Sequence, residues 1–266
     1  MAEQLLKLNG KVAIITGAGS SGPGIGTGKA ISMLFAREGA HVVLVDKYED
    51  RAKETLRLIE DEGGQATIVT ADLADVAASQ HVVDQAITAY GAVDVLVNNA
   101  AITLPAGILD TTPQQYEEVL AINLTAPFMM TRAVLPVMVE RGGGSIVNIT
   151  SIAALRGQGG KGATAYATAK AGLLGLTTDV ADAFGTKGIR VNCIAPGIID
   201  TPMRNAVIAR AGLDPAKVDL TSRTSLGIEG DAWDIARAAL FLAGPDGRYI
   251  TGVLLPVDGG STARSH

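Results

Sequence analysis

The chain has 266 residues, of which 47% are hydrophobic and 18% charged, against a usual charged share of about 25%. This composition supports a large buried core and excludes a disordered chain. The 32 glycines follow no G-x-y period, which excludes a collagen-like chain. The formal charge is −5 and no Lys/Arg-rich run occurs, so we expect no nucleic-acid partner.

A single cysteine, Cys193, cannot form an internal disulfide, and residues 1–7 lack the basic and then apolar pattern of a signal peptide. The apolar β-branched runs are strand-length, well short of the roughly 20 residues of a membrane-spanning helix. We therefore expect a cytoplasmic protein that does not bind a membrane.

Short apolar runs and amphipathic segments alternate along the first half of the chain. The expected elements are a strand at 11–16, a helix at 29–38, a strand at 41–46, a helix at 51–62, a strand at 66–70, a helix at 79–90 and a strand at 93–97. Uninterrupted apolar strands separated by helices are typical of a parallel sheet that is covered on both faces.

The second half continues the alternation, with a long helix expected from Pro113 to Glu140, kinked at Pro127 and ending between Pro136 and Gly142. The remaining expected elements are a strand at 144–150, a helix at 166–184, a strand at 190–194, a helix at 231–242 and a strand at 253–257. Residues 196–230 are polar and broken by prolines. The pattern predicts one α/β domain over 1–266, a Rossmann-type, doubly wound parallel sheet of about seven strands with helices on both faces.

A glycine-rich loop follows the first strand. Gly17 to Gly22 matches G-x-G-x-x-G, but the motif requires a helix to open there, and three more glycines and a proline follow. Counting back from the helix end instead places its start after Gly28, with Gly26 and Gly28 at the helix N-terminus, where backbone N–H groups receive a pyrophosphate. The sequence Gly28-Lys29 resembles the end of a P-loop, but Pro23 and Ala30 occupy the positions of its first glycine and its magnesium-binding hydroxyl.

Asp46 ends the second strand, 20 residues after Gly26, where a carboxylate can accept hydrogen bonds from the adenosine ribose. The same charge repels the additional phosphate of NADP, although the neighbouring Lys47 softens that repulsion. We expect NAD as the cofactor, with NADP as the less favoured alternative.

Three further motifs occur along the chain, each after an expected strand or at the start of an expected helix. In chain order they are Asn98-Asn99-Ala100-Ala101, Tyr166-x-x-x-Lys170 and Pro196-Gly197. In order and spacing the chain resembles the short-chain dehydrogenase/reductase family from Gly10 to Gly260. Its ending, Tyr249 to Gly260, is similar to that of the tetrameric reductases of the family. The resemblance implies NAD(P)-dependent oxidation and reduction and a homotetramer.

Tyr166 and Lys170 stand four residues apart and share one helix face, where an ammonium is expected to lower the pKa of the phenol toward a working acid/base. The resemblance makes Ser151 the residue that binds the substrate oxygen. Ser151 lies 15 residues before Tyr166 rather than about 13, so we infer an insertion at Gly157–Gly162, with Thr150 as the alternative serine equivalent. By the same resemblance, Asn123 completes the catalytic set by holding a water.

The resemblance also assigns the remaining cofactor contacts, with Asp72 and Leu73 beside the adenine, Asn99 at a ribose, and Ile199 and Thr201 at the nicotinamide. The full set of expected cofactor-binding residues is Gly17, Ser20, Gly26, Thr27, Gly28, Asp46, Lys47, Asp72, Leu73, Asn99, Tyr166, Lys170, Pro196, Gly197, Ile199 and Thr201.

The expected substrate residues are Ala153, Leu155, Ile198 and Met203, together with a loop at about 198–228. We predict reversible hydride transfer between a secondary alcohol and its ketone, with an apolar substrate for which a cyclic alcohol is one candidate. The alternatives are a 3-oxoacyl-thioester reductase of the same family and a noncatalytic NAD-binding sensor. No metal is expected, because the three histidines are scattered and the chain has one cysteine.

Overall fold

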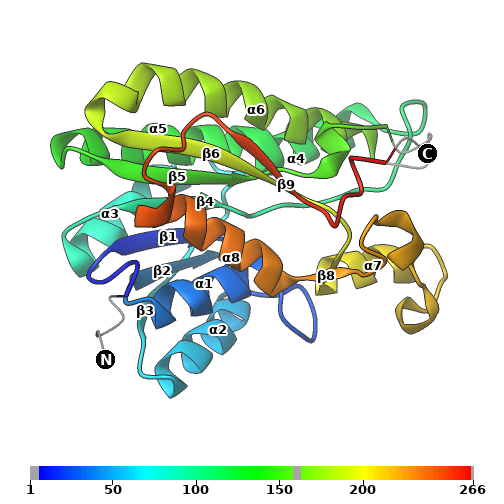
Figure 1. Ribbon diagram of the computed structural model, residues 1–266, viewed down its shortest axis with the longest axis horizontal. Helices are drawn as coiled ribbons and strands as arrows, with labels where there is room; N and C mark the ends of the chain where they lie inside the picture. Colours follow the sequence, from blue (N-terminus) through cyan, green and yellow to red (C-terminus); the bar gives the residue numbers. More distant parts are fainter. Residues whose placement is uncertain (1–5, 158–162, 265–266) are drawn as a thin grey trace.

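A seven-stranded parallel sheet forms the centre of the computed structural model, which describes residues 6–157 and 163–264 (Figure 1). The strand order is β3-β2-β1-β4-β5-β6-β9. The strands are β1 (Val12–Thr16), β2 (His41–Asp46), β3 (Gln65–Thr70), β4 (Val95–Asn98), β5 (Gly144–Ile149), β6 (Ile189–Pro196) and β9 (Leu254–Val257). The expected doubly wound α/β sheet is confirmed.

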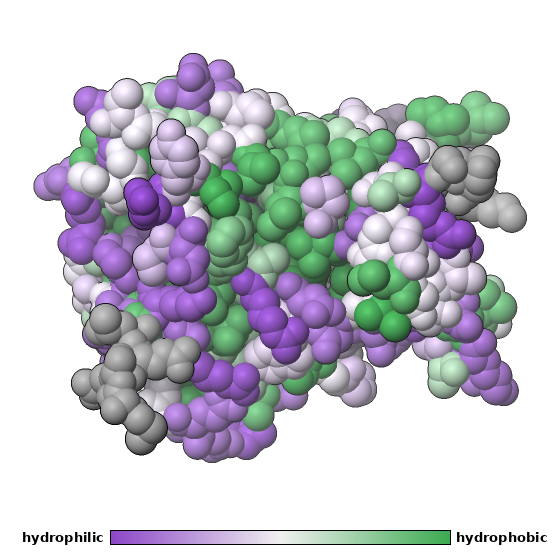
Figure 2. All heavy atoms as spheres, in the orientation of Figure 1, coloured by the Kyte–Doolittle hydropathy of each residue, from purple (hydrophilic) through white to green (hydrophobic). Residues whose placement is uncertain are grey.

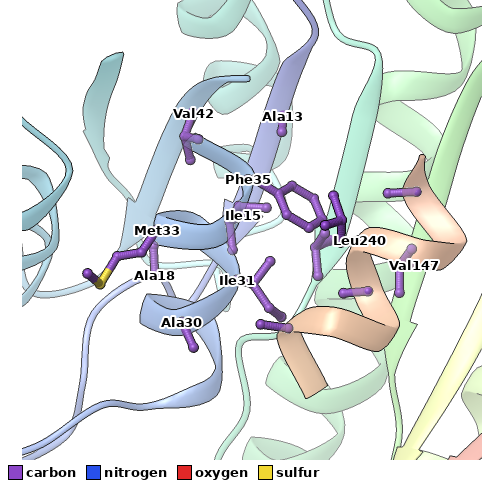
Figure 3. Close-up of a cluster of buried hydrophobic side chains, with 14 of the residues drawn as sticks. Ala13, Ile15, Ala18, Ala30, Ile31, Met33, Phe35, Val42, Val147 and Leu240 are labelled. Atoms are coloured by element: carbon purple, nitrogen blue, oxygen red, sulfur yellow. The ribbon is translucent and has the colours of Figure 1, made fainter. Parts of the chain in front are cut away.

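Helices cover both faces of the sheet. One layer holds α1 (Thr27–Arg37), α2 (Glu49–Asp61) and α8 (Ala232–Ala243). The other layer holds α3 (Ala78–Tyr90), α5 (Ala126–Glu140) and α6 (Thr164–Phe184), and α4 (Pro113–Leu120) packs beside α6. Figure 3 shows how Phe35 and Ile31 of α1 meet Leu240 of α8 in the first layer.

The order of the strands fixes where the site must lie. The chain leaves β1 for β2 on one side and returns after β3 to place β4 on the other side. In open parallel sheets, ligands bind in the crevice at the carboxyl ends of the strands on either side of such a reversal. The loops after β1 and β4 therefore border this crevice.

The long helix expected over 113–140 ends at Glu140, within the expected range, but it is not one regular α-helix. It is interrupted by a π-helical turn at Ala121–Thr125, just before the expected kink at Pro127, and it passes through Pro136. Because the π turn widens the backbone locally, it accommodates Pro127 at the start of α5.

The same stretch, Pro113–Glu140, is long and apolar enough to cross a membrane by length and composition alone. The apolar runs considered in the sequence did not indicate such a span. In the fold, Met130, Val134 and Met138 of this stretch are buried in the core between α5 and the sheet.

A loop was expected at about 198–228, and this was wrong in part. The range contains the helix α7 (Pro202–Arg210) and a strand of a two-stranded parallel sheet, β7 (Ile199–Asp200), which pairs with β8 (Gly230–Asp231). Thr201 caps α7 by accepting a hydrogen bond from the N–H of Arg204 at 3.4 Å.

Candidate active site

A cavity of about 450 Å³ lies at the carboxyl end of the sheet, between the loops that follow β1, β4, β5 and β6. It brings together most of the residues that the sequence singled out. Those that line it are Gly17, Ser20, Gly26, Thr27, Gly28, Asp46, Asn99, Ser151, Tyr166, Lys170, Pro196, Gly197, Ile198, Ile199, Thr201 and Met203.

Six expected residues do not line this cavity: Lys47, Asp72, Leu73, Asn123, Ala153 and Leu155. Lys47 and Asp72 pair with each other at 2.7 Å between Nζ and Oδ2, and Leu73 packs into the core. Ala153 is buried in the turn behind Ser151, whereas Leu155 is exposed. The expected insertion next to these residues lies, from 158 to 162, outside the described part of the chain.

The glycine loop closes directly onto the first helix. A Cβ on Gly28 would lie 1.9 Å from the carbonyl oxygen of Gly17, so only glycine allows this contact. Helix α1 begins at Thr27, earlier than the expected start at residue 29, so Gly28 lies inside its first turn. Gly26 caps the helix without a side-chain hydrogen bond, and its own N–H donates to Ser20 Oγ at 2.8 Å.

This geometry fits a dinucleotide. The N-terminus of α1 faces the cavity through Gly26, Thr27 and Gly28, and the helix dipole favours an anion there. Because Gly26 and Gly28 line the cavity without side chains, a pyrophosphate can approach the backbone there.

The far end of the cavity holds a carboxylate and a guanidinium. Asp46 accepts backbone hydrogen bonds from Gly19 through Oδ2 and from Tyr48 through Oδ1, each at 3.0 Å. Arg51, which the sequence reasoning missed, lines the cavity and stacks 4.0 Å above the Tyr48 ring. The sequence signal that could have identified Arg51 was its position in the first turn of the helix that follows Asp46.

The opposite end of the cavity holds the group with acid/base chemistry. Tyr166 and Lys170 lie on successive turns of α6, with Lys170 Nζ 5.6 Å from the centre of the Tyr166 ring. Lys170 Nζ donates to the carbonyl oxygen of Ile149 at 2.8 Å. Ser151 follows β5 and caps the short turn Ile152–Ala154; its hydroxyl accepts from Ala153 N at 3.1 Å, so its own proton is available to another partner.

Thr150 lines the cavity as well, but its hydroxyl is committed elsewhere. It donates to the carbonyl oxygen of Lys170 at 2.7 Å inside the protein. The geometry therefore favours Ser151 over Thr150 as the hydroxyl that faces a substrate.

The pKa of Tyr166 differs from the expectation that Lys170 lowers it. Burial raises the pKa of Tyr166 to about 12, and the Ser151 hydroxyl offsets this only partly. Burial also lowers the pKa of Lys170 to about 8. Desolvation therefore decides the direction of the pKa shift of Tyr166. The Lys170 ammonium does not reverse it, because that ammonium is itself desolvated and donates to the carbonyl oxygen of Ile149.

Asn123 lies on the π-helical turn and is fully buried. Its Nδ2 donates to the carbonyl oxygens of Ile102 at 3.0 Å and Val119 at 2.8 Å. Its Oδ1 is buried and has no hydrogen-bond partner among the described residues. A buried acceptor of this kind is suited to a water.

The walls beyond Ser151 come mainly from the segment that was expected to lack regular structure. Ile198 and Met203 line the cavity as expected, and Arg204, Val207, Ile208 and Leu220 add to the wall from within the expected loop at 198–228. Thr103, from the loop after β4, faces α7, and Arg210 Nη1 donates to its carbonyl oxygen at 3.5 Å.

The comparisons with known proteins agree with this geometry. Residues 22–262 match the family model described as enoyl-(acyl carrier protein) reductase. The 3-oxoacyl-[acyl-carrier-protein] reductase FabG of Thermotoga maritima is 36% identical over 255 residues, which cover 96% of this chain and 99% of that protein. The chain is a short-chain dehydrogenase/reductase. Its fold, its NAD(P)-dependent oxidoreductase class and its action on CH–OH groups follow from this membership.

Two further similar proteins differ in what their names describe. The 2,5-dichloro-2,5-cyclohexadiene-1,4-diol dehydrogenase LinX of Sphingobium indicum is 37% identical over 254 residues, 96% of this chain and 97% of that protein. A blue fluorescent protein from a metagenomic library, solved with NADPH, is 39% identical and superposes with a TM-score of 0.84 over 96% of this chain and 99% of that one.

Proposed function

We propose that this short-chain dehydrogenase/reductase transfers hydride reversibly between a nicotinamide cofactor and a secondary alcohol or its ketone. The observation that carries the proposal is that Tyr166, Lys170 and Ser151 meet at one end of a cavity whose other end is the glycine loop. The bound cofactor supplies or accepts the hydride.

The side chains of the site divide the remaining work. Ser151 donates a hydrogen bond to the reacting oxygen, and Tyr166 Oη exchanges a proton with that oxygen. Since the pKa of Tyr166 is raised to about 12, the phenol of the free enzyme is protonated at neutral pH and is ready to donate to a ketone. Lys170 holds its positive charge beside the ring, and Asn123 holds the water that relays protons.

We infer that NAD is preferred over NADP. Asp46 presents a carboxylate at the adenosine end of the cavity, where it favours two ribose hydroxyls over a phosphate. Arg51 in the same wall, and the NADPH bound to the related blue fluorescent protein, support NADP as the alternative. Asp46→Asn should raise kcat/KM for NADP relative to NAD by about tenfold, because it removes one charge at this position. An unchanged ratio contradicts the inference.

The substrate that fits is an apolar secondary alcohol, with cyclic alcohols as the first candidates. Ile198, Met203, Val207, Ile208 and Leu220 add apolar side chains to the cavity that Ser151 also lines, and the related LinX is named for a cyclic diol. The relative named as a 3-oxoacyl-[acyl-carrier-protein] reductase supports a thioester ketone as the second candidate.

The test is a panel of secondary alcohols with NAD and of ketones with NADH, followed by the absorbance of the reduced cofactor. We expect turnover of cyclic apolar members. Turnover confined to 3-oxoacyl thioesters favours the second candidate, and cofactor binding without any turnover favours the sensor.

We further propose that residues 1–266 form one domain in which 198–228 recognises the substrate, and that the protein is a cytoplasmic homotetramer. Two features support assembly. The edge strand β9 pairs only with β6 within the described ranges, and Figure 2 shows hydrophobic side chains gathered over that edge. An apolar groove of about 420 Å³ also runs between α5 and α6, with Phe128 exposed beside it. Light scattering tests the tetramer, and a monomer mass at micromolar concentration refutes it.

A further inference from the structure

An ion pair lies directly behind the substrate wall. Arg204 on α7 lines the cavity, and its Nη2 lies 2.8 and 2.9 Å from the two carboxylate oxygens of Glu229. Both side chains are mostly enclosed, at 15% exposure for Arg204 and 18% for Glu229. A contact this enclosed is screened less by water than a surface pair.

The fold positions both partners. Glu229 immediately precedes β8, which pairs with β7 just before α7 begins at Pro202. The Glu229 carboxylate also accepts a hydrogen bond from Leu220 N at 3.0 Å, so it connects the segment after α7 to Arg204. Figure 1 shows α7 and β8 together at the right-hand end of the molecule.

Most donors of Arg204 are already used. Besides its bonds to Glu229, Nη2 donates to the carbonyl oxygen of Val218 at 3.2 Å, and Nη1 donates to Asn205 Oδ1 at 2.9 Å. The Nε atom is buried and has no hydrogen-bond partner within 6–157 and 163–264. Asp200 Oδ1, at 3.9 Å from Nη1, adds a second negative charge.

The consequence concerns the charge of the substrate. The wall that residues 198–220 contribute is mainly apolar and includes Arg204, whose guanidinium is neutralised by Glu229. A substrate carboxylate placed there loses its hydration without gaining a free cation, which is costly. An uncharged alcohol or ketone does not meet this cost.

We propose that Glu229 is a specificity-determining positioning residue: it neutralises Arg204 and so restricts the pocket to uncharged substrates. This inference rests on the proposed function, because it concerns which substrates that reaction accepts. Its test measures binding and needs no turnover, so a failure of the catalytic proposal remains distinguishable.

The experiment compares two probes of one shape, cyclohexanecarboxamide and cyclohexanecarboxylate, by titration calorimetry in the presence of saturating NADH. The parent protein should bind the neutral amide at least ten times more tightly than the carboxylate. Glu229→Gln retains acceptors for Arg204 and Leu220 but removes the charge, so the preference should shift toward the carboxylate by about tenfold.

Two matched variants separate charge from shape. The double variant Arg204→Gln with Glu229→Gln should restore the parent preference, because the guanidinium is then removed from the wall. Asp214→Asn, which neutralises a carboxylate of the same segment that does not line the cavity, should leave the ratio unchanged. An unchanged ratio in Glu229→Gln, or no measurable binding of either probe by that variant and by the parent, overturns the proposal.

Discussion

Lys170 is a buried ammonium whose presence should cost stability. Its side chain is 1% exposed, and burial lowers its pKa from 10.5 to about 8. At about 1.4 kcal/mol per pH unit, keeping this charge in the folded protein costs about 3 kcal/mol at neutral pH. Lys170→Met removes that cost and leaves the carbonyl oxygen of Ile149 without its donor, a loss of about 1 kcal/mol. The variant should be about 2 kcal/mol more stable than the parent at pH 7 while losing at least a hundredfold in turnover.

The pH dependence identifies the cause. Between pH 8 and 10.5 the unfolded parent binds more protons than the folded parent, so the stability of the parent rises with pH over that window. By pH 10 the free energy of unfolding of Lys170→Met should therefore lie within about 0.5 kcal/mol of that of the parent. Urea unfolding at both pH values measures this, with the exposed Lys187→Met as control. The reasoning is refuted if Lys170→Met is less stable than the parent at pH 7. It is also refuted if the stability advantage of Lys170→Met is the same at both pH values.

Two further predictions concern the glycines and the pH profile. Gly28→Ala should weaken cofactor binding at least tenfold, because its Cβ would meet the Gly17 carbonyl oxygen at 1.9 Å, whereas Gly175→Ala, in open space on α6, should stabilise the fold by up to about 1 kcal/mol. Cofactor titration and urea unfolding check the pair, and an unchanged dissociation constant for Gly28→Ala contradicts it. For ketone reduction, kcat/KM should fall above pH about 8 as Lys170 loses its proton, since the pKa of Tyr166 lies near 12. A profile that stays flat past pH 10 is incompatible with this assignment.

The parallel sheet could be predicted from the sequence because its strands are buried on both faces. The run Val12–Thr16 is buried throughout, and an uninterrupted apolar run of this length between turn residues is typical of such a strand. The positions of Tyr166 and Lys170 on one helix face likewise follow from spacing alone.

The sequence predictions that were wrong depended on contacts between distant residues, which the spacing of residue types does not report. Gly28 looked like a residue that precedes a helix, but it lies in the first turn of α1, close to the Gly17 carbonyl oxygen, a contact that forms only when the loop folds. Helix α7 is short and lies among prolines, and the pairing of Arg204 with Glu229 across 25 residues helps to hold it. The raised pKa of Tyr166 depends on enclosure by several segments, which no local pattern reports.

The central claim is that Tyr166 exchanges the proton while hydride passes to or from the nicotinamide. Turnover of a secondary alcohol with NAD and of its ketone with NADH should be compared between the parent and Tyr166→Phe, which keeps the ring and removes only the hydroxyl. The account predicts a loss of about a thousandfold in both directions with cofactor binding preserved. Turnover by Tyr166→Phe within a few-fold of the parent would contradict it.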